Sequence, residues 1–228
     1  MIRNVLIDLD DTILDFKKCE ATALAESFVQ LGVEPTDELI KRYSEINEMM
    51  WKRLERKEVT REEVLTGRFA ILIEEKGMDV DPNKIRTIYE DILSRQAFKK
   101  PGADELLERL KDEYDLYLVS NGTASVQHGR IDEANIERFF KKMFISQEVG
   151  YNKPDKRFFD IAFSQIGDIN LDETVIIGDS LSSDIQGGIN AGIHTVWFND
   201  MDYEPSDLIK PEITIKTLES VDEVIKNL

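Results

Sequence analysis

The sequence has little cysteine and histidine and no long apolar run. Its 228 residues include one cysteine and two histidines. Cys19 cannot form an internal disulfide, which fits a reducing compartment, and with no histidine cluster to match it we interpret it as a small core residue. No stretch approaches the roughly 18 apolar residues that a membrane helix needs. Because the N-terminus begins a strand at once, we expect no signal peptide and a cytoplasmic protein without membrane contact.

Basic residues are also scarce relative to acidic ones. The chain has 29 Lys and Arg against 46 Asp and Glu, a formal net charge of −17. This balance excludes nucleic acid polymers and anionic membranes as nonspecific partners, because the electrostatic interaction is repulsive. A small anion can still bind through a metal ion, one lysine and helix N-termini, since remote charges are screened.

The stretch from Asn4 to Thr12 combines a short apolar strand with three acids. Residues two apart in a strand point the same way, so we expect Asp8 and Asp10 to share a side, with Cα atoms about 6–7 Å apart. Two carboxylates at that spacing suggest a divalent cation site such as Mg²⁺. The competing interpretation is that Asp10, Asp11 or Thr12 caps the turn or helix that follows.

Residues 15–97 are predicted to form about four helices without a strand. Their apolar residues recur at steps of three and four, and Thr60-Arg61-Glu62-Glu63 has the form of a capping box. From residue 98 the pattern alternates between helices and short apolar strands at 116–119, 143–146, 174–177, 194–198 and 213–215. This alternation predicts an α/β fold with a parallel sheet covered on both faces. We therefore expect a core domain of residues 1–15 and 98–228, and an inserted all-helical cap domain of residues 16–97.

Polar residues follow three more of the predicted strands. Ser120 and Asn121 end one strand, Lys153 stands in the loop before a helix, and Asp179 ends another strand with Asp184 five residues on. The carboxyl ends of parallel strands meet at one edge of a sheet, which is where open α/β sheets bind ligands. Asp8, Asp10 and Asp179 can supply oxygens to Mg²⁺, whereas Lys153, Ser120 and backbone N–H groups can hold phosphate oxygens.

At this point the sequence resembles the haloacid dehalogenase (HAD) superfamily of aspartate-nucleophile phosphohydrolases. Residues 8–12 look like its first motif, Ser120 its second and Lys153 its third, and Gly178-Asp179 with Asp184 resembles its fourth. The resemblance covers nearly the whole chain and implies a Rossmann-like core with a helical cap. Residues 120–123 and 150–155 further resemble the house-cleaning pyrimidine 5′-nucleotidase branch.

The resemblance also implies a role for each residue. Asp8 would attack phosphorus and form an aspartyl-phosphate, and Asp10 would act as general acid and then as general base. Mg²⁺ would be held by Asp8, Asp179 and the main-chain carbonyl of Asp10. The substrate phosphoryl group would be bound by Lys153, Ser120 and Asn121. Thr12 and Asp184 would support the site, Asp184 by positioning Lys153 or a metal-bound water.

The expected function is thus Mg²⁺-dependent hydrolysis of a small phosphomonoester, in particular a (deoxy)pyrimidine nucleoside monophosphate. A phosphatase or mutase acting on small sugar phosphates or phosphoglycolate is the alternative. A haloacid dehalogenase is disfavoured because those family members lack an acid at the position of Asp10, and an inactive phospho-ligand-binding protein is disfavoured because Asp8 and Asp10 are both present.

Two expectations concern residues outside the motifs. The cap offers four side chains that could stack on a base, namely Phe28, Met50, Trp51 and Phe69, although all four also suit ordinary packing. Among the three acids of the first stretch, Asp11 is expected to point away from the site and to be the most replaceable.

Overall fold

The apolar runs of the alternating part form one parallel sheet. The structure is a computed structural model that describes residues 1–228. The strands are β1 (Asn4–Asp8), β2 (Asp115–Ser120), β3 (Lys142–Ile145), β4 (Thr174–Gly178), β5 (His194–Phe198) and β6 (Ile213–Ile215). They pair in the order β3-β2-β1-β4-β5-β6, with every neighbouring pair parallel. β1 therefore lies inside the sheet, between β2 and β4.

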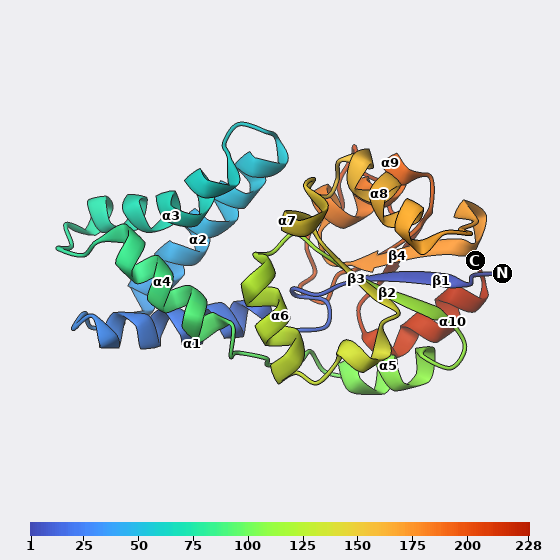
Figure 1. Ribbon diagram of the computed structural model, residues 1–228, viewed down its shortest axis with the longest axis horizontal. Helices are drawn as coiled ribbons and strands as arrows, with labels where there is room; N and C mark the ends of the chain where they lie inside the picture. The colour runs from blue at the N-terminus through green and yellow to red at the C-terminus, as the bar shows by residue number, and fades with distance from the viewer.

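Helices cover both faces of this sheet (Figure 1). The helices are α5 (Ala103–Leu110), α6 (Ala124–Glu133), α7 (Ser146–Val149), α8 (Lys156–Ile166), α9 (Gln186–Ala191) and α10 (Val221–Lys226). In β1, Val5 and Ile7 pack with α5 and α10, whereas Leu6 packs with α8 and α9. Successive strand residues point to opposite faces, so the middle of β1 is apolar on both of its faces, and the Rossmann-like α/β architecture predicted from the sequence is confirmed.

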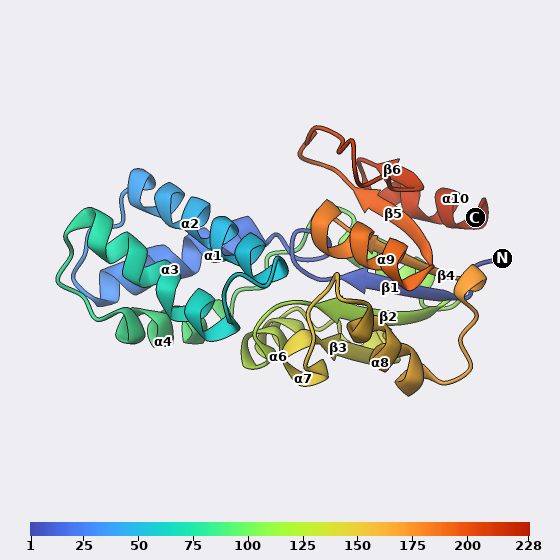
Figure 2. The same ribbon diagram turned by 90° about the horizontal axis from the view of Figure 1, so that it is seen from above.

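The first four helices form a separate lobe beside the carboxyl ends of the strands (Figures 1 and 2). They are α1 (Phe16–Gln30), α2 (Asp37–Glu55), α3 (Arg61–Lys76) and α4 (Pro82–Leu93). The predicted capping box is present, because the Thr60 side chain accepts from the Glu63 N–H and the Glu63 carboxylate accepts from Thr60 N–H. Their apolar faces enclose a hydrophobic cluster that is distinct from the two clusters of the sheet.

The chain passes between the two lobes twice, and the two passages are hydrogen-bonded to each other. Asp15 N donates to Phe98 O at 2.8 Å and Lys100 N donates to Ile13 O at 2.9 Å. The two connecting segments between the lobes thus run side by side. We keep the division into residues 1–15 with 98–228 and residues 16–97 as a proposal that this geometry supports.

Three of the predicted segments differ in detail. The strand expected over residues 143–146 ends at Ile145, and Ser146 begins the short helix α7. The helix expected from about Ser183 to Ala191 begins as a π-helical turn, Leu181–Ile185, before α9. The last predicted helix begins with a 3₁₀ turn, Leu218–Ser220, before α10. No helix of the structure is both long and apolar enough to cross a bilayer.

Candidate active site

The strand ends bring the predicted site residues together. In the register of the sheet Asp8 pairs with Val119, the neighbour of Ser120, and Ile7 pairs with Ile177, two residues before Asp179. Asp8 and Ser120 are almost fully buried. The carboxyl ends of β1, β2 and β4 therefore form one polar edge, as expected for a parallel sheet.

Lys153 lies at the centre of this edge and is 1% exposed. Its Nζ donates to Asp8 Oδ1 at 2.6 Å, to Asp184 Oδ1 at 2.7 Å and to the Val119 carbonyl at 3.0 Å. All three ammonium donors are thus used. Burial lowers the pKa of Lys153, but the adjacent Asp184 and Asp8 carboxylates more than reverse this and raise it. Lys153 is held as a fixed, charged donor.

Asn121 holds the main chain of this lysine. Its amide donates to the Lys153 carbonyl at 2.9 Å and to Ser183 Oγ at 3.1 Å, and its carbonyl oxygen accepts from Lys153 N at 2.9 Å. The predicted contact between Asn121 and substrate stays a prediction. In this structure the side chain fixes the loop that presents Lys153.

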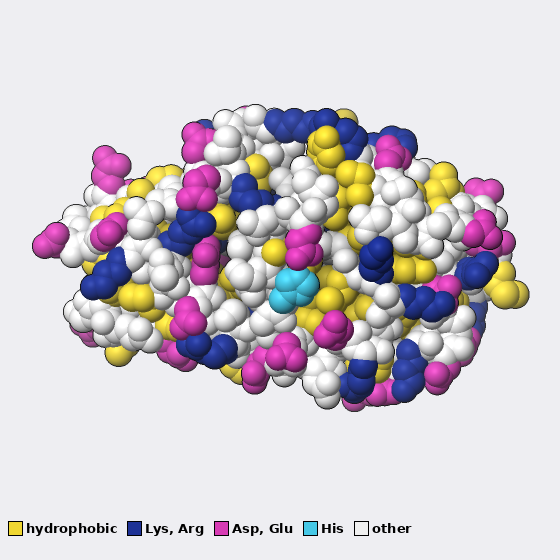
Figure 3. Space-filling model, viewed as in Figure 1, with side chains coloured by type: hydrophobic (Ala, Val, Ile, Leu, Met, Phe, Trp, Pro, Cys, Tyr) yellow, Lys and Arg dark blue, Asp and Glu magenta, His cyan; other side chains and the backbone are white.

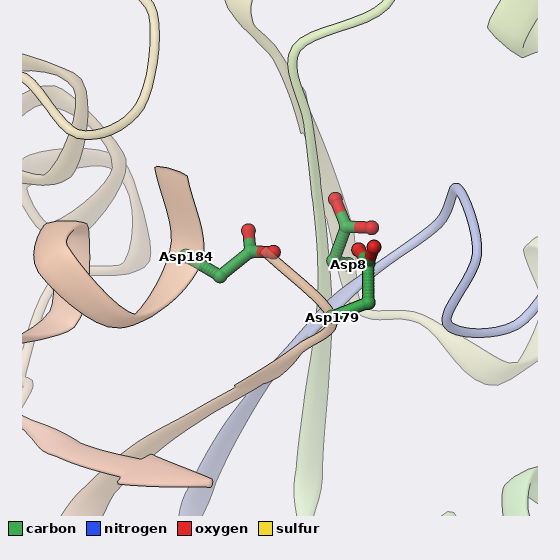
Figure 4. Close-up of side chains that lie close together, drawn as sticks. All are labelled: Asp8, Asp179 and Asp184. Atoms are coloured by element: carbon green, nitrogen blue, oxygen red, sulfur yellow. The ribbon is translucent and has the colours of Figure 1, made fainter. Parts of the chain in front are cut away.

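Three carboxylates gather beside Lys153. Oxygens of Asp8, Asp179 and Asp184 lie within 4.8 Å of one another. Figure 4 shows the Asp8 and Asp179 carboxylates directed to the same space, with Asp184 approaching from its own turn. Asp184 accepts from Lys153 and from Ser180 N at 3.1 Å, whereas Asp8 Oδ2 and the Asp179 carboxylate accept no hydrogen bond from the protein. Unpaired carboxylate oxygens are the ligands that Mg²⁺ prefers, so these residues fit that ion.

The charge balance of the site also indicates a binding site for a divalent cation. Burial raises the pKa of Asp8 to about 8, with Lys153 opposing and Asp184 and Asp10 adding to the rise. Burial also raises the pKa of Asp179 well above its ordinary value, and the nearby Asp8 and Asp184 add to this. One lysine does not offset three buried acids. A divalent cation at Asp8 and Asp179 would lower both pKa values and allow both groups to be ionised at neutral pH.

The carboxylate of Asp10 is hydrogen-bonded to α6 and is not one of the three carboxylates that gather beside Lys153. Gln127 Nε2 donates to Asp10 Oδ2 at 2.7 Å, and Arg130 Nη1 donates to Asp10 Oδ1. Gln127 Nε2 also donates to Ser120 Oγ at 2.7 Å. Asp8 and Asp10 line the same cavity, whereas Leu9 between them is completely buried in the core, so the two acids share a side as expected. The predicted acid–base role of Asp10, and metal binding by its carbonyl, stay predictions.

Sequence reasoning missed Gln127 and Arg130. Arg130 is completely buried, and its Nε donates to the carbonyl of Gln96 at 3.1 Å, next to the second passage between the lobes. The available signal was two polar residues three positions apart on α6, beside the buried Val126 and Ile131. Such a pattern does not reveal which distant carboxylate the side chains meet.

Thr12 and Asp11 complete the first stretch. Thr12 Oγ1 accepts from Asp179 N at 3.1 Å and so connects β1 to the end of β4. The expectation that Asp11 points away from the site needs correction, because Asp11 lines the same cavity as Asp8. Its φ is +57°, and its carboxylate accepts from Phe16 N at 3.0 Å at the start of α1. Burial raises the pKa of Asp11. Asp11 therefore accepts a hydrogen bond at the start of α1, as in the competing interpretation, beside the N-cap residue Asp15, and its replaceability stays a prediction.

A cavity of about 210 Å³ extends from the carboxylates into the helical lobe. Only Trp51 of the four suggested stacking residues lines it. Phe28 and Phe69 are completely buried and Met50 is 4% exposed, all within the hydrophobic cluster of the lobe, so for these three the packing interpretation is the correct one. Phe16, which the sequence did not single out, also lines the cavity.

The adjoining ends of α2 and α3 are attached to the core beside this cavity. Arg61 Nη2 donates to the Asn121 carbonyl at 3.1 Å, to Ser146 Oγ at 2.6 Å and to Asn152 Oδ1 at 2.6 Å. Burial lowers the pKa of Arg61, which has no carboxylate among these partners. At the end of α2, Glu55 accepts from Ser182 Oγ at 2.8 Å. The helical lobe therefore contacts the loops that present the site residues.

Comparison with known proteins gives relatives that span the chain. The family model described as haloacid dehalogenase-like hydrolase matches residues 5–198. YfnB of Bacillus subtilis, named as a HAD-hydrolase, is 36% identical over 224 residues, which are 98% of this chain and 95% of that protein. Pyrimidine 5′-nucleotidase PynA of Streptococcus pneumoniae is 36% identical over 86% of this chain and 83% of its own length.

The fold has matching solved structures as well. A crystal structure of YfnB bound to magnesium superposes with a TM-score of 0.94 at 35% identity, covering 98% of both chains. L-2-haloacid dehalogenase from Xanthobacter autotrophicus has a TM-score of 0.81 at 13% identity, with both chains fully covered, and shares the fold. The parallel sheet with its helical insertion, the polar edge at the strand ends and the family model agree, and the chain belongs to the haloacid dehalogenase-like hydrolases.

Proposed function

We propose that this enzyme is a Mg²⁺-dependent phosphomonoester hydrolase that acts through an aspartyl-phosphate intermediate. The observation that supports it most is Asp8, held at 2.6 Å by Lys153 beside the unpaired carboxylate of Asp179, at the entrance to the cavity. The proposed nucleophile Asp8, the ammonium group of Lys153 and the candidate metal ligand Asp179 thus lie at one polar edge of the sheet. The single cysteine agrees with a cytoplasmic location.

In the proposed reaction an Asp8 oxygen attacks phosphorus, while the bond between phosphorus and the leaving oxygen breaks. Asp10 gives its proton to the leaving oxygen, then removes a proton from the water that attacks the phospho-aspartate and releases phosphate. The Lys153 donor that contacts Asp8 in this structure would pass to a phosphoryl oxygen, together with the hydroxyl of Ser120, whose Oγ accepts two hydrogen bonds and donates none within the protein. Mg²⁺ held by Asp8, Asp179 and the Asp10 carbonyl would neutralise charge on the phosphoryl group.

For the substrate we propose (deoxy)pyrimidine nucleoside monophosphates. PynA and YjjG, the latter from Escherichia coli and 28% identical over 97% of this chain, are both named pyrimidine 5′-nucleotidases. The competing substrate class is small sugar phosphates, because the glyceraldehyde 3-phosphate phosphatase of Pyrococcus abyssi is 29% identical over 87% of this chain. A cavity of about 210 Å³ is smaller than the roughly 300–1,000 Å³ of pockets for drug-sized ligands, and suits either class of small ester.

The mechanism is tested by phosphate release from dUMP and from an aryl phosphate, with Mg²⁺ and with excess EDTA. We expect EDTA to abolish turnover and Asp8→Asn to lower kcat at least about a thousandfold, because the nucleophile is lost. Asp160→Asn, an exposed acid on α8, is the matched control and should retain wild-type activity. Turnover that survives EDTA, or full activity of Asp8→Asn, would contradict the mechanism. Comparing kcat/KM for pyrimidine monophosphates, glyceraldehyde 3-phosphate and phosphoglycolate tests the substrate class, and a preference for the last two would overturn the nucleotidase assignment.

A further inference from the structure

The part of the active-site cavity that the helical lobe lines contains two charged side chains that the proposed reaction does not use. Arg68 of α3 and Glu90 of α4 line the cavity together with Trp51 of α2. They come from three helices of the inserted lobe, whereas Asp8 ends β1 and the other carboxylates and Lys153 lie in the segments that follow the strands of the core. A substrate with its phosphate on Lys153 would therefore direct its leaving group toward the helical lobe.

Arg68 is placed in an otherwise aromatic environment. It is 4% exposed, and its guanidinium lies 5.2 Å from the ring centres of Phe69 and Tyr89 and 5.9 Å from that of Tyr43. Burying a cation costs several kcal/mol, and an apolar side chain would pack here without that cost. The position of Arg68 therefore suggests a role other than stabilising the lobe.

Hydrogen bonds fix the guanidinium but leave part of it free. Nη1 donates to Asn47 Oδ1 at 2.8 Å and Nε donates to the Leu65 carbonyl at 3.3 Å. Asn47 is itself oriented by a 2.7 Å hydrogen bond to the buried Glu20. Nη2 makes no hydrogen bond and lies 4.0 Å from Glu90 Oε1. The pair thus retains an unused donor on Arg68.

Glu90 supplies an acceptor next to this donor. Its Oε1 accepts from Arg86 Nε at 3.1 Å, and its Oε2 accepts no hydrogen bond within the protein. The Glu90 side chain is 20% exposed, against 5% for Arg68. One free N–H donor and a carboxylate with one free oxygen are therefore neighbours in the part of the cavity that the helical lobe lines.

We propose that Arg68 and Glu90 recognise the hydrogen-bonding edge of a pyrimidine base in the leaving group, an inference that rests on the proposed function. Uracil and thymine present a carbonyl acceptor beside the N3–H donor, and cytosine presents the N3 acceptor beside its amino group. Arg68 donates to the acceptor and Glu90 accepts from the donor. Trp51 offers a ring against which the base can stack.

The same pair disfavours the competing leaving groups. A leaving group that ends in a carboxylate meets the charge of Glu90, and a bare sugar phosphate has no planar edge that matches an adjacent donor and acceptor. A second fused ring has less room in a cavity of about 210 Å³. The geometry therefore favours pyrimidine over purine monophosphates.

The test compares two substrates that differ only in the base, dUMP and 2-deoxyribose 5-phosphate. Arg68→Lys keeps the charge but removes the planar set of donors, and Glu90→Gln keeps the shape but removes the charge. The matched controls are Arg42→Lys and Glu75→Gln, since Arg42 and Glu75 form a pair between α2 and α3, with hydrogen bonds of 2.7 and 2.8 Å, outside the cavity. Circular dichroism shows whether each variant is folded. If Arg68→Lys is not folded, the result for Glu90→Gln alone tests the proposal.

We expect each cavity variant to lower the ratio of kcat/KM for dUMP to that for 2-deoxyribose 5-phosphate by about 10- to 100-fold, mostly through KM. Binding of dUMP to the same variants in an Asp8→Asn background should weaken by a similar factor in calorimetry. Both control variants should keep the wild-type ratio. A wild-type enzyme that does not prefer dUMP would overturn the nucleotidase assignment and this inference together. A wild-type preference that survives in both cavity variants would overturn this inference alone.

Discussion

At the residue level, the site depends on how tightly Lys153 is held. Its three donors contact Asp8, Asp184 and a main-chain carbonyl, so none is free to rotate. Asp184 reaches Lys153 only because the last residue of β4 has no side chain. A Cβ added to Gly178 would lie 2.3 Å from the carboxyl carbon of Asp184. Gly178 therefore provides the space on which the position of Lys153 depends.

Gly178→Ala tests this dependence. The added methyl group should displace Asp184 and thereby Lys153, and we expect kcat/KM to fall by roughly a hundredfold because misplacement of about 1 Å has that effect. Steady-state kinetics together with thermal unfolding separate a loss of activity from a loss of fold. Gly67→Ala is the matched control, since its Cβ would meet only the flexible end of Met50 at 3.3 Å. Wild-type kcat/KM in Gly178→Ala would show that Asp184 does not position Lys153.

At the level of elements, α1 and α2 are joined by a buried polar contact inside the helical lobe. Glu20 of α1 is 3% exposed and accepts hydrogen bonds from Ser44 and Asn47 of α2. Burial raises the pKa of Glu20 to about 7, although both hydrogen bonds oppose the rise. Glu20 thus binds a proton in the folded protein at pH values where the unfolded chain has lost it. This contribution to stability is complete below the ordinary pKa of 4.5 and is lost as the pH rises through about 7.

Glu20→Gln should remove this pH dependence. We expect the free energy of unfolding of the variant, relative to that of wild type, to be roughly 2–3 kcal/mol larger at pH 8 than at pH 4.5, since each pKa unit corresponds to about 1.4 kcal/mol. Urea unfolding at the two pH values measures this difference. Glu26→Gln, an exposed position of the same helix, is the control and should show the same relative stability at both. A constant difference for Glu20→Gln would mean that folding leaves the pKa of Glu20 unchanged.

At the level of the whole molecule, the negative net charge opposes an anionic substrate. The formal charge is −17, and Figure 3 shows acidic and basic side chains interspersed over one face without a continuous basic region. Attraction must then come from the site itself, through Lys153 and the cation that Asp8 and Asp179 suit. The local and the global field therefore have opposite effects on substrate approach.

Ionic strength distinguishes the two fields. Raising KCl from about 10 to 150 mM shortens the Debye length from roughly 30 to 8 Å, which screens the remote charges more than the buried ones. We expect kcat/KM for dUMP to rise about two- to fivefold at constant free Mg²⁺, with kcat unchanged. Initial rates at subsaturating and saturating substrate measure both quantities. A steady fall of kcat/KM with salt would show that local attraction dominates at all distances.

Local patterns were sufficient to predict the sheet, the helical insertion and the shared edge of Asp8, Ser120, Lys153 and Asp179. Strand and helix periods are properties of neighbouring residues, and a parallel topology brings strand ends to one edge whatever the details of packing. The capping box at Thr60 was predictable for the same reason, since its partner is three residues away.

The sequence by itself determined which segments form the elements and which of their ends meet. Only the tertiary structure decided that Asp10 turns to Gln127 and Arg130, and that Trp51, Arg68 and Glu90 line the cavity while Phe28 and Phe69 do not. Helical periodicity identifies the buried face of a helix but does not distinguish contact with a neighbouring helix from contact with an enclosed cavity. That distinction depends on how the helices pack and how the lobe meets the sheet, through contacts between residues far apart in the chain.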